Sequence, residues 1–471
     1  MKRQWHGSVY TKSLWERPRL VIVASGPESP ITMFASTRLL LKSELGMVGR
    51  WVRPTLSRSS ASLCSVADQA LLSAVNFAIG MYFVHFSTKD EYGLYAISYG
   101  IITLMISFAG ALIMTPMTVS YADKPKEQRE SYCASMLMGQ YGIFLPAIGL
   151  VLLIITFLYR ASVLQLDTTR LATVIGIAAA GGMLWEFSRR YYYLRLKPAT
   201  VLRWDICYAT IMAIGLVGAM YSNVTGMHWW IFVIYGLATT GTGLWALSQS
   251  ELAHPSGLYQ VWESVRESWH HGRWTLGGVL VTWVQNQSFI YFLAVFADLS
   301  SVADANAARL LVAPLMLVNS GLTNVLLPRL VLLRSEKRYT EAEQMAQRLM
   351  WMITGIFVFY TAIVVMAEGR LTRLVLGNAY TGLESFILAW GVVNLLTALR
   401  GNVSVLLQVF KAFRIITLAN IGSAIAVVLV TWPLMYYYGV LGSIAAVALG
   451  EIILVVLLRS AFAHVRRTYA Y

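Results

Sequence analysis

Long uninterrupted apolar runs constrain this chain more than any other feature of its sequence. About a dozen runs of roughly 17 to 25 residues carry few charges, and each could cross a hydrocarbon core of ~30 Å as a helix. The first six lie at residues 63–86, 94–114, 136–159, 171–187, 206–221 and 229–247. The second six lie at residues 274–296, 305–327, 349–366, 386–409, 415–436 and 441–458. The runs do not alternate every second residue, so we predict an all-α polytopic membrane bundle of about twelve transmembrane helices.

The distribution of basic residues along the chain predicts how these helices are oriented. Only 13% of the residues are charged, yet the formal net charge is +14. The N-terminal tail and every second loop together hold 30 of the Lys and Arg residues, and the opposite loops hold 5. Arg309 and Arg400 lie inside predicted spans and complete the 37. By the positive-inside rule, the basic loops and both termini are expected in the cytoplasm, and the charge does not indicate a nucleic-acid partner.

An internal repeat divides the chain into two halves. A shift of 212 positions places Phe77 on Phe289 and Pro116 on Pro328, and the order of spans and loops also agrees. We therefore expect an N-terminal six-helix lobe at residues 61–250 and a C-terminal six-helix lobe at residues 274–471. A central cytoplasmic loop at 251–273 joins them, and the lobes are related by an axis along the membrane normal.

Residues 1–60 precede the first span and form a basic cytoplasmic tail or an overextended reading frame. Met33 and Met47 are both plausible internal starts, so whether residues 1–46 are translated stays open. Residues 33–53 could form a helix in the membrane interface. The three cysteines lie near cytoplasmic span ends, where thiols stay reduced, so no disulfide is expected.

Several short segments, in order along the chain, resemble one family of membrane proteins. The sequence DQALLSAVNF begins at Asp68, and EYGLY follows from Glu91. Further segments are TPM from Thr115, EFSRRY from Glu186, AARLLVAP from Ala307, GVLGSIAA from Gly439, and the pair Gly450 and Glu451. Together they resemble polysaccharide-unit flippases of the Wzx kind, within the multidrug/oligosaccharidyl-lipid/polysaccharide exporter (MOP) superfamily. The resemblance covers the chain from about Ser60 to its C-terminus.

The resemblance implies two six-helix lobes around a central cavity that opens alternately to each side of the bacterial inner membrane. The implied cargo is an undecaprenyl-pyrophosphate-linked oligosaccharide repeat unit, exported for lipopolysaccharide or exopolysaccharide synthesis. Such a flippase is a transporter rather than an enzyme and has no cofactor. Its partners would be the lipid-linked oligosaccharide, membrane lipid, and polysaccharide polymerase and chain-length proteins.

Two arginines inside spans are candidate ligands for the pyrophosphate. Arg400 lies in line with Thr397, Ser404 and Gln408 on an otherwise apolar helix. An arginine within a membrane is costly, so it should face a cavity or a partner, and guanidinium can bind a pyrophosphate through two parallel hydrogen bonds. The alternative is a structural ion pair with Glu451. Arg309 is also predicted to contact substrate, unless its side chain reaches back to the outer interface.

Amide side chains at helical spacing suggest contacts with sugar hydroxyls. Gln69 and Asn76 lie on one face of the first span, and Gln285 and Asn286 lie at the middle of the seventh. Neutral amides offer hydrogen-bond donors and acceptors without the cost of burying a charge. Hydrogen bonding between helices is an equally good interpretation of these residues.

The acidic residues within spans receive different predictions. Asp68, Glu186 and Asp205 lie near cytoplasmic span ends, where we expect water to reach them. Glu451 lies deeper and could take up a proton or ion in a coupled cycle, or pair with an arginine.

Two other function classes remain open. A cation-coupled drug exporter of the same superfamily would place acidic residues in the cavity. A membrane polysaccharide polymerase or ligase would carry a large outer loop, which this sequence lacks. No nucleotide-binding loop, zinc-ligand spacing or catalytic triad is recognised, so neither catalytic nor metal-binding residues are predicted. The identity of the glycan, the coupling ion and the oligomeric state stay open.

Overall fold

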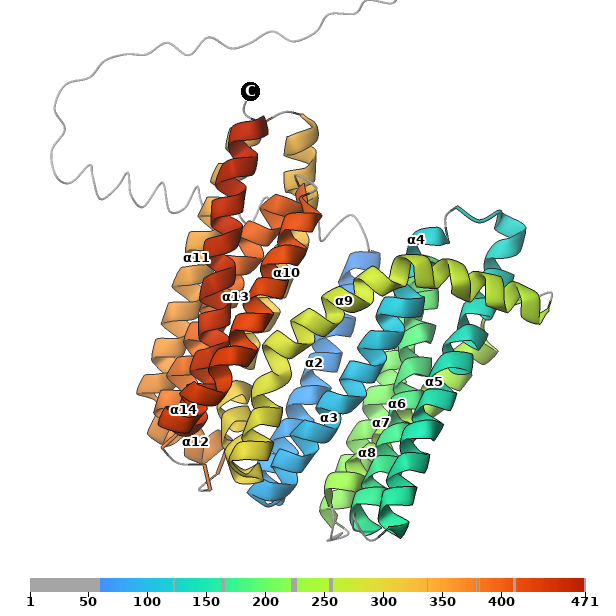
Figure 1. The fold of residues 1–471 in the computed structure, drawn as a ribbon, viewed down its shortest axis with the longest axis horizontal. Coiled ribbons are helices and arrows are strands. Elements are labelled where there is room, and N and C mark those ends of the chain that lie inside the picture. Colours follow the sequence, from blue (N-terminus) through green and yellow to red (C-terminus); the bar gives the residue numbers. More distant parts are fainter. Residues whose placement is uncertain are drawn as a thin grey trace, which may run out of the picture. The chain divides into compact units, whose positions relative to one another are not determined.

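The computed structural model describes residues 60–121, 123–161, 166–221, 227–253, 257–336, 338–377, 379–380, 382–409 and 412–469. The predicted tail at residues 1–60 lies outside this part of the chain except for Ser60, as do the alternative starts and the interfacial helix at 33–53. The first helices are α2 (Ser60–Phe86), α3 (Lys89–Ala109), η1 (Gly110–Met114), α4 (Thr115–Ser120), η2 (Lys126–Gln128), α5 (Arg129–Arg160), α6 (Leu166–Leu194), α7 (Pro198–Tyr221) and α8 (Met227–Ser248). They are followed by α9 (Leu258–Phe296), α10 (Leu299–Ser335), α11 (Tyr339–Met366), α12 (Glu368–Val375), α13 (Glu384–Val409) and α14 (Phe413–Tyr469) (Figure 1).

The helices coincide with the predicted spans. Ten helical stretches in the described ranges are long and apolar enough to cross a membrane. One of them, Arg414–His464, covers two predicted spans. These meet near Gly439, where the backbone leaves the helical conformation inside α14 (φ 56°, ψ −135°). The remaining predicted span, 305–327, lies within α10. The prediction of an all-α membrane bundle is therefore confirmed.

The internal repeat is visible in the helix boundaries. A shift of 212 positions carries α3 onto α10, α5 onto α11 and α6 onto α13. The same shift carries α7 and α8 onto the two parts of α14 on either side of Gly439. Within the first half α6 packs along α8, and within the second half α13 packs along α14. We call these halves the N-lobe (α2–α8) and the C-lobe (α9–α14).

The connection between the lobes is more ordered than the sequence suggested. Residues 258–273, which were expected in a central loop, form the first part of α9 and continue without a break into the next span. Figure 1 shows α9 crossing the N-lobe near α4 before it descends, and along its course it packs against η1, α5 and α3. We call the end of the bundle where α9 begins the basic end, since the Lys- and Arg-rich loops lie there.

A proline explains how α9 is attached to the N-lobe. Pro116 has no N–H to donate to the carbonyl of Leu112, four residues earlier, and the preceding turn η1 is a π-helix. The Leu112 carbonyl accepts a hydrogen bond from the hydroxyl of Ser268 on α9. Gly272 of α9 lies against the backbone of Ala111 and Leu112, where a β-carbon would come within 2.9 Å of the Leu112 α-carbon.

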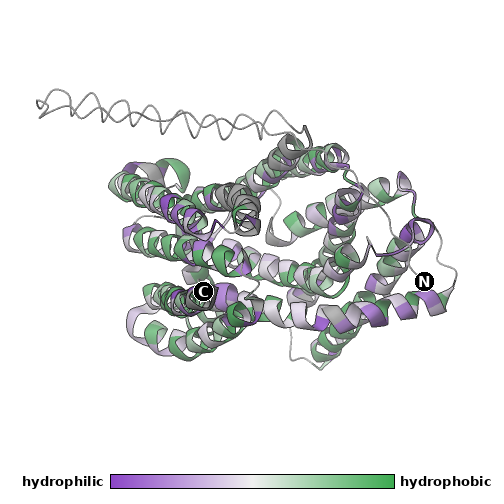
Figure 2. Cartoon of the chain, turned by 90° about the horizontal axis from the view of Figure 1, so that it is seen from above, coloured by the Kyte–Doolittle hydropathy of each residue, from purple (hydrophilic) through white to green (hydrophobic). Residues whose placement is uncertain are grey.

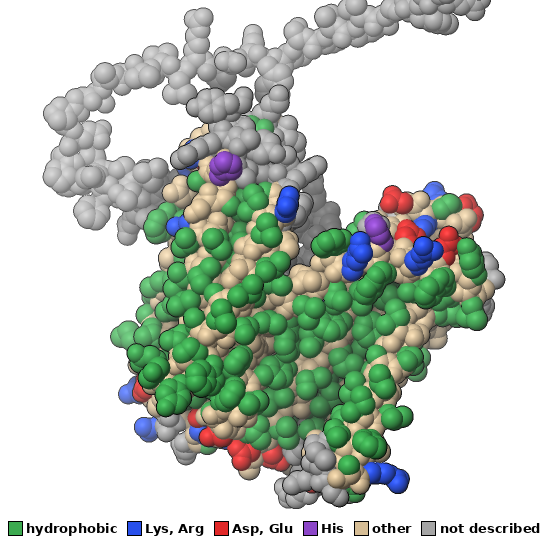
Figure 3. Space-filling model, in the orientation of Figure 1, with side chains coloured by type: hydrophobic (Ala, Val, Ile, Leu, Met, Phe, Trp, Pro, Cys, Tyr) green, Lys and Arg blue, Asp and Glu red, His purple; other side chains and the backbone are tan. Residues whose placement is uncertain are grey.

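The outer surface of the bundle suits a lipid solvent. Large apolar side chains such as Leu153, Phe157 and Ile214 are exposed on the spans. Seen from above, apolar residues follow the helices along most of their length (Figure 2). Figure 3 shows apolar side chains over the middle of one face and charged side chains gathered toward its two ends. Exposed apolar area on this scale requires a hydrocarbon environment.

Candidate functional site

In the C-lobe, three of the predicted site residues meet around one buried carboxylate. Glu451 of α14 is fully buried, and its Oε2 accepts a hydrogen bond of 2.7 Å from Nε of Arg400 on α13. The amide of Gln285 on α9 donates to the other oxygen, Oε1, at 3.4 Å. Within the predicted polar stripe on α13, Arg400 thus faces an acidic partner, whereas the amide of Gln408 donates to the Ser404 hydroxyl at 3.3 Å.

The pair does not use all of the guanidinium. Arg400 keeps 22% of its side-chain surface exposed, whereas Glu451 has none. A guanidinium has five N–H donors, and the bond to Glu451 is made through Nε. The ion pair that the sequence left as an alternative is present, and it leaves part of Arg400 accessible to an anion.

A cleft of about 680 Å³ lies between the lobes, toward the basic end of the spans. One wall is the second half of α3 at Ser107, and the other is formed by α9 and α14. Its lining residues, all of them in the described parts of these helices, include no Asp, Glu, Lys or Arg. The volume falls within the range of roughly 300 to 1,000 Å³ that is usual for ligand pockets.

The cleft combines indole rings with amides. Trp274 and Trp283 line it together with Asn286, Gln287 and Asn420. The indole N–H of Trp283 and the Oε1 of Gln287 are buried and have no hydrogen-bond partner among the residues that the structure describes. Buried polar atoms of this kind are costly unless a ligand or water satisfies them. The chemistry of the cleft therefore suits a neutral molecule with many hydroxyl groups.

Of the predicted amides, Asn286 alone lines this cleft. Its Nδ2 donates to the Thr282 carbonyl at 2.8 Å, and this leaves its Oδ1 available as an acceptor. Asn76 and Gln69 are exposed on α2. The Oδ1 of Asn76 accepts a hydrogen bond of 3.3 Å from the Tyr99 hydroxyl. The amide of Gln69 donates to Asp68 at 3.4 Å.

Arg309 lies apart from Arg400, in the first half of α10. Its guanidinium carbon is 5.2 Å from the ring centroid of Trp390 on α13, a cation–π contact. The side chain is partly buried rather than extended into solvent. The structure therefore places Arg309 against an aromatic ring, and the prediction that it contacts substrate stays a prediction.

The N-lobe contains a second charged cluster, which was not predicted from the sequence. Arg189 of α6 donates from Nη2 to Asp68 of α2 at 2.8 Å and from Nε to Asp205 of α7 at 2.8 Å. Its Nη1 donates to Glu186 at 2.7 Å. Asp68 and Asp205 are fully buried, which corrects the expectation that water reaches them. Their oxygens instead receive further donors, the Tyr193 hydroxyl for Asp68 and the Trp185 indole N–H for Asp205.

The sequence contained only part of the signal for this cluster. The spacing of Glu186 and Arg189, three residues apart on a helix, predicts that they are neighbours. Asp68 lies 121 positions from Arg189 and on another helix, so only the packing of α2 against α6 brings the two together.

At the opposite end of the bundle the lobes are in contact. Lys89, at the start of α3, forms an ion pair of 2.6 Å with Asp304 of α10. Lys89 also lies 5.1 Å from the ring centroid of Tyr380, which packs edge-on against Tyr92. Gly93 allows the close approach, since a β-carbon there would lie 2.1 Å from the Leu299 carbonyl oxygen.

These features define the class of protein: a polytopic membrane bundle of two repeated lobes, open between the lobes toward one end and closed at the other.

In the parts of the chain that the structure describes, no group of three or more His, Cys, Asp or Glu side chains could hold a metal ion.

Comparisons with known proteins identify the fold. No protein-family model and no curated protein sequence matches the chain. The lipid II flippase MurJ, in an inward closed conformation, superposes with a TM-score of 0.67 at 13% identity over 85% of this chain and 87% of its own. An inward-facing multidrug resistance MATE family transporter of the MOP superfamily gives 0.59 at 12% identity, covering 88% and 97%. A MOP superfamily transporter from Pyrococcus furiosus, noted for the reverse polarity of its binding pocket, gives 0.58 at 12% identity, covering 87% and 94%. The chain has the two-lobed fold of MOP superfamily transporters.

Proposed function

We propose that this chain is a flippase that exports undecaprenyl-pyrophosphate-linked oligosaccharide repeat units across the bacterial inner membrane by alternating access. The observation that carries the proposal is the uncharged cleft between the lobes. The described lining residues of the cleft include no carboxylate to balance a cation, whereas the indole ring of Trp283 can pack on a sugar ring and the amide of Asn286 can pair with its hydroxyl groups. The similarity of the fold to a lipid II flippase supports the same class of cargo.

The pyrophosphate requires a cation, and Arg400 is our candidate. Gln285 and Asn286 are neighbours on α9, and they place the Arg400–Glu451 cluster and the cleft on adjoining faces of one helix. The exposed part of the Arg400 guanidinium can donate to phosphate oxygens while Glu451 holds its Nε. With the basic end in the cytoplasm, an inside-negative potential drives an anion outward by about 2.3 kcal/mol per charge per 100 mV. Arg309 would make a second contact nearer the opposite end.

The cleft is tested with asparagines that share one local geometry. Asn286, Asn420 and Asn306 each donate from Nδ2 to the carbonyl four residues earlier, at 2.8, 2.9 and 2.9 Å. Asn286 and Asn420 line the cleft, and Asn306 does not. Replacing either cleft residue by Ala should lower glycan export several-fold at unchanged protein level. Asn306→Ala should behave like the wild type.

Export is measured as surface polysaccharide formed in cells, with protein level from immunoblots of the membrane fraction. An equal loss of export in all three variants would mean that the asparagines act through helix stability. Wild-type export in both cleft variants would overturn the assignment of the cleft to the glycan.

One observation favours a second candidate, a cation-coupled exporter of small molecules. The N-lobe cluster contains three carboxylates, those of Asp68, Asp205 and Glu186, around the guanidinium of Arg189. Arg190 contacts Glu186 at 3.5 Å, so three carboxyl groups face two guanidinium groups. Purified protein in vesicles distinguishes the two functions. A cation exporter accumulates a fluorescent organic cation when a proton or sodium gradient is imposed, and a glycan flippase does not.

The partners and location of the chain follow from the same proposal. A flippase of this kind delivers its cargo to a polysaccharide polymerase and to chain-length proteins, in a multi-pass arrangement with both termini in the cytoplasm. The Lys and Arg asymmetry supports this orientation. Reporter fusions after Ser222 and Asp298 should report an outside location, and a fusion after His254 an inside one.

A further inference from the structure

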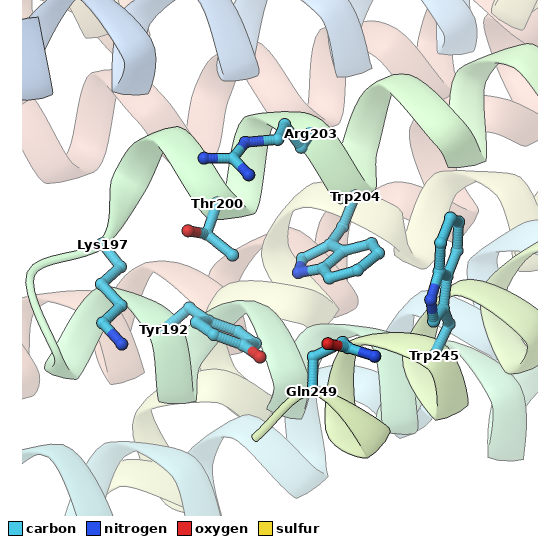
Figure 4. Close-up of a pocket in the computed structure, with 7 residues that line it drawn as sticks. All are labelled: Tyr192, Lys197, Thr200, Arg203, Trp204, Trp245 and Gln249. Atoms are coloured by element: carbon cyan, nitrogen blue, oxygen red, sulfur yellow. The ribbon is translucent and has the colours of Figure 1, made fainter. Parts of the chain in front are cut away.

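A second cavity lies within the N-lobe, and its lining shares no residue with the cleft or with the Arg400 and Arg189 clusters. It has a volume of about 390 Å³ and lies where α6 ends, α7 begins and α8 ends, at the basic end of the bundle. Figure 4 shows Lys197, Thr200 and Arg203 along the beginning of α7, with Tyr192 and Gln249 on the facing wall. Its walls therefore combine two cationic side chains with hydroxyl and amide groups.

The charge around this cavity is positive after its acidic neighbour is counted. Glu251 is the carboxylate that pairs here, with Arg195 at 2.6 Å and with Lys197 at the longer distance of 3.6 Å. The hydrogen bond from Arg195 holds the pKa of Glu251 below its usual value, so this carboxylate is ionised and taken chiefly by Arg195. Lys197 and Arg203 therefore remain as cations for a ligand. The beginning of α7 adds the partial positive charge of a helix N-terminus.

Two tryptophans close one side of the cavity. The rings of Trp204 and Trp245 are 4.8 Å apart and meet edge to face. The indole N–H of Trp204 is buried and has no hydrogen-bond partner in the described part of the chain. Tryptophan is typical of the boundary between lipid headgroups and hydrocarbon, where one part of the ring is apolar and the other hydrogen-bonds. The cavity thus lies at headgroup depth.

Apolar tracks lead from the cavity toward the middle of the membrane. On α7, exposed side chains recur at helical spacing from Arg203 through Ile206, Ile214 and Val217. On α8, Leu237 and Leu244 are exposed on the turns that precede Trp245. Because α7 packs along α8, the two tracks lie on neighbouring helices. Their spacing suits hydrocarbon chains that descend from a headgroup held by the cavity.

We propose that this cavity binds the phosphate headgroup of an anionic phospholipid, with the acyl chains of the lipid along α7 and α8. Lys197 and Arg203 contact the phosphate, and Thr200, Gln249 and the Trp204 N–H donate to the oxygens of the headgroup and glycerol. The tracks explain why the ligand is a lipid, and the cations explain why it is anionic. This inference does not depend on the cargo of the transporter.

The test measures lipid binding to the intact protein by native mass spectrometry, with phosphatidylglycerol and phosphatidylcholine as probes. The variant Lys197→Gln/Arg203→Gln removes both cations from exposed positions. The control Lys126→Gln/Arg266→Gln removes two exposed cations from the same end of the bundle, outside the cavity. We expect the tightest phosphatidylglycerol binding to weaken by roughly tenfold or more in the cavity variant and to be unchanged in the control.

Three results would overturn the proposal. Equal weakening in the control would show a general attraction to positive charge, and equal binding of phosphatidylcholine would show no role for the headgroup charge. A phosphatidylglycerol affinity unchanged in the cavity variant would place the lipid elsewhere.

Two competition experiments distinguish a phospholipid from other ligands that carry a phosphate. Soluble glycerol phosphate should not compete at millimolar concentration, because it lacks the acyl chains, and full displacement by it would make the cavity a site for a water-soluble anion. If a polyprenyl pyrophosphate displaced bound phosphatidylglycerol when present at the lower concentration of the two, the cavity would be assigned to the cargo.

Discussion

Each lobe has an arginine at nearly the same place in the repeat, yet the two arginines differ in their surroundings. Shifted by 212 positions, Arg189 of α6 falls one residue beyond Arg400 of α13. Arg189 is 9% exposed and holds carboxylates on three helical segments, whereas Arg400 is 22% exposed and holds Glu451. The comparison shows how arginines one residue apart in the repeat can differ in enclosure. The arginine enclosed by carboxylates fixes helices, and the arginine left partly open can bind an anion.

The largest expected effect is from Arg189→Met. This change leaves Asp68 and Asp205 fully buried without their guanidinium, and loss of one partner of a buried ion pair costs about 3 to 5 kcal/mol. We expect little protein in the membrane and a strongly lowered melting temperature in detergent. If the variant accumulates and melts like the wild type, the structural role assigned to Arg189 is wrong.

Arg400 is expected to separate stability from transport. Arg400→Ala should abolish glycan export. It should also lower the free energy of unfolding, and with it the protein level, but by less than the roughly 3 to 5 kcal/mol expected for a fully enclosed pair. Glu451→Gln in the same chain should restore the level without restoring export. Arg400→Lys should recover export only in part, since a point charge lacks the paired donors of guanidinium.

The measurement for Arg400 is a double-mutant cycle that scores protein level and export separately. Recovery of both quantities in the double variant would show that the pair is purely structural and would falsify the anion-binding role.

A smaller effect is expected from Asp205→Asn. Arg189 keeps Asp68 and Glu186, but an Asn has a single acceptor oxygen and can accept from only one of the two donors, the Trp185 indole N–H and the Arg189 Nε. The loss of stability should be about 1.5 to 3 kcal/mol, a typical value for one hydrogen bond to a charged group. Thermal unfolding in detergent measures it. A loss as large as that of Arg189→Met would show that all of the carboxylates are needed for the cluster.

The smallest effect is expected for the ion pair between the lobes. Lys89 and Asp304 are 31% and 21% exposed, and pairs near water contribute about 0 to 1 kcal/mol. Lys89→Met should therefore change the melting temperature by a few degrees at most. Any change in export caused by this variant would show whether the ion pair affects opening of the lobes at this end. A large destabilisation would mean that the lobes act as one folding unit.

The sequence predicted the helices and the repeat because both depend on local patterns. Run length alone located the spans, and Gly439 separates the two spans within α14. The Arg400–Glu451 pair was named from the sequence because both residues are charges deep in spans. The Arg189 cluster was not, because Asp68 and Asp205 lie near span ends and only tertiary packing removes them from water. The cleft joins residues of α3, α9 and α14, which no local pattern relates.

The continuity of α9 has a mechanical consequence. Its first part is tied to the N-lobe through Ser268 and Gly272, and its second part carries Trp283 and Asn286 into the cleft. A continuous helix passes a rotation or shift of one end on to the other end, whereas a flexible linker does not. Gly277 and Gly278 lie between the two parts, and a β-carbon added at either position would meet no atom within 4 Å. Since glycine weakens a helix, bending of α9 costs least there. The lobes are thus joined by one helix, and a movement of the N-lobe would also move Trp283 and Asn286 in the cleft.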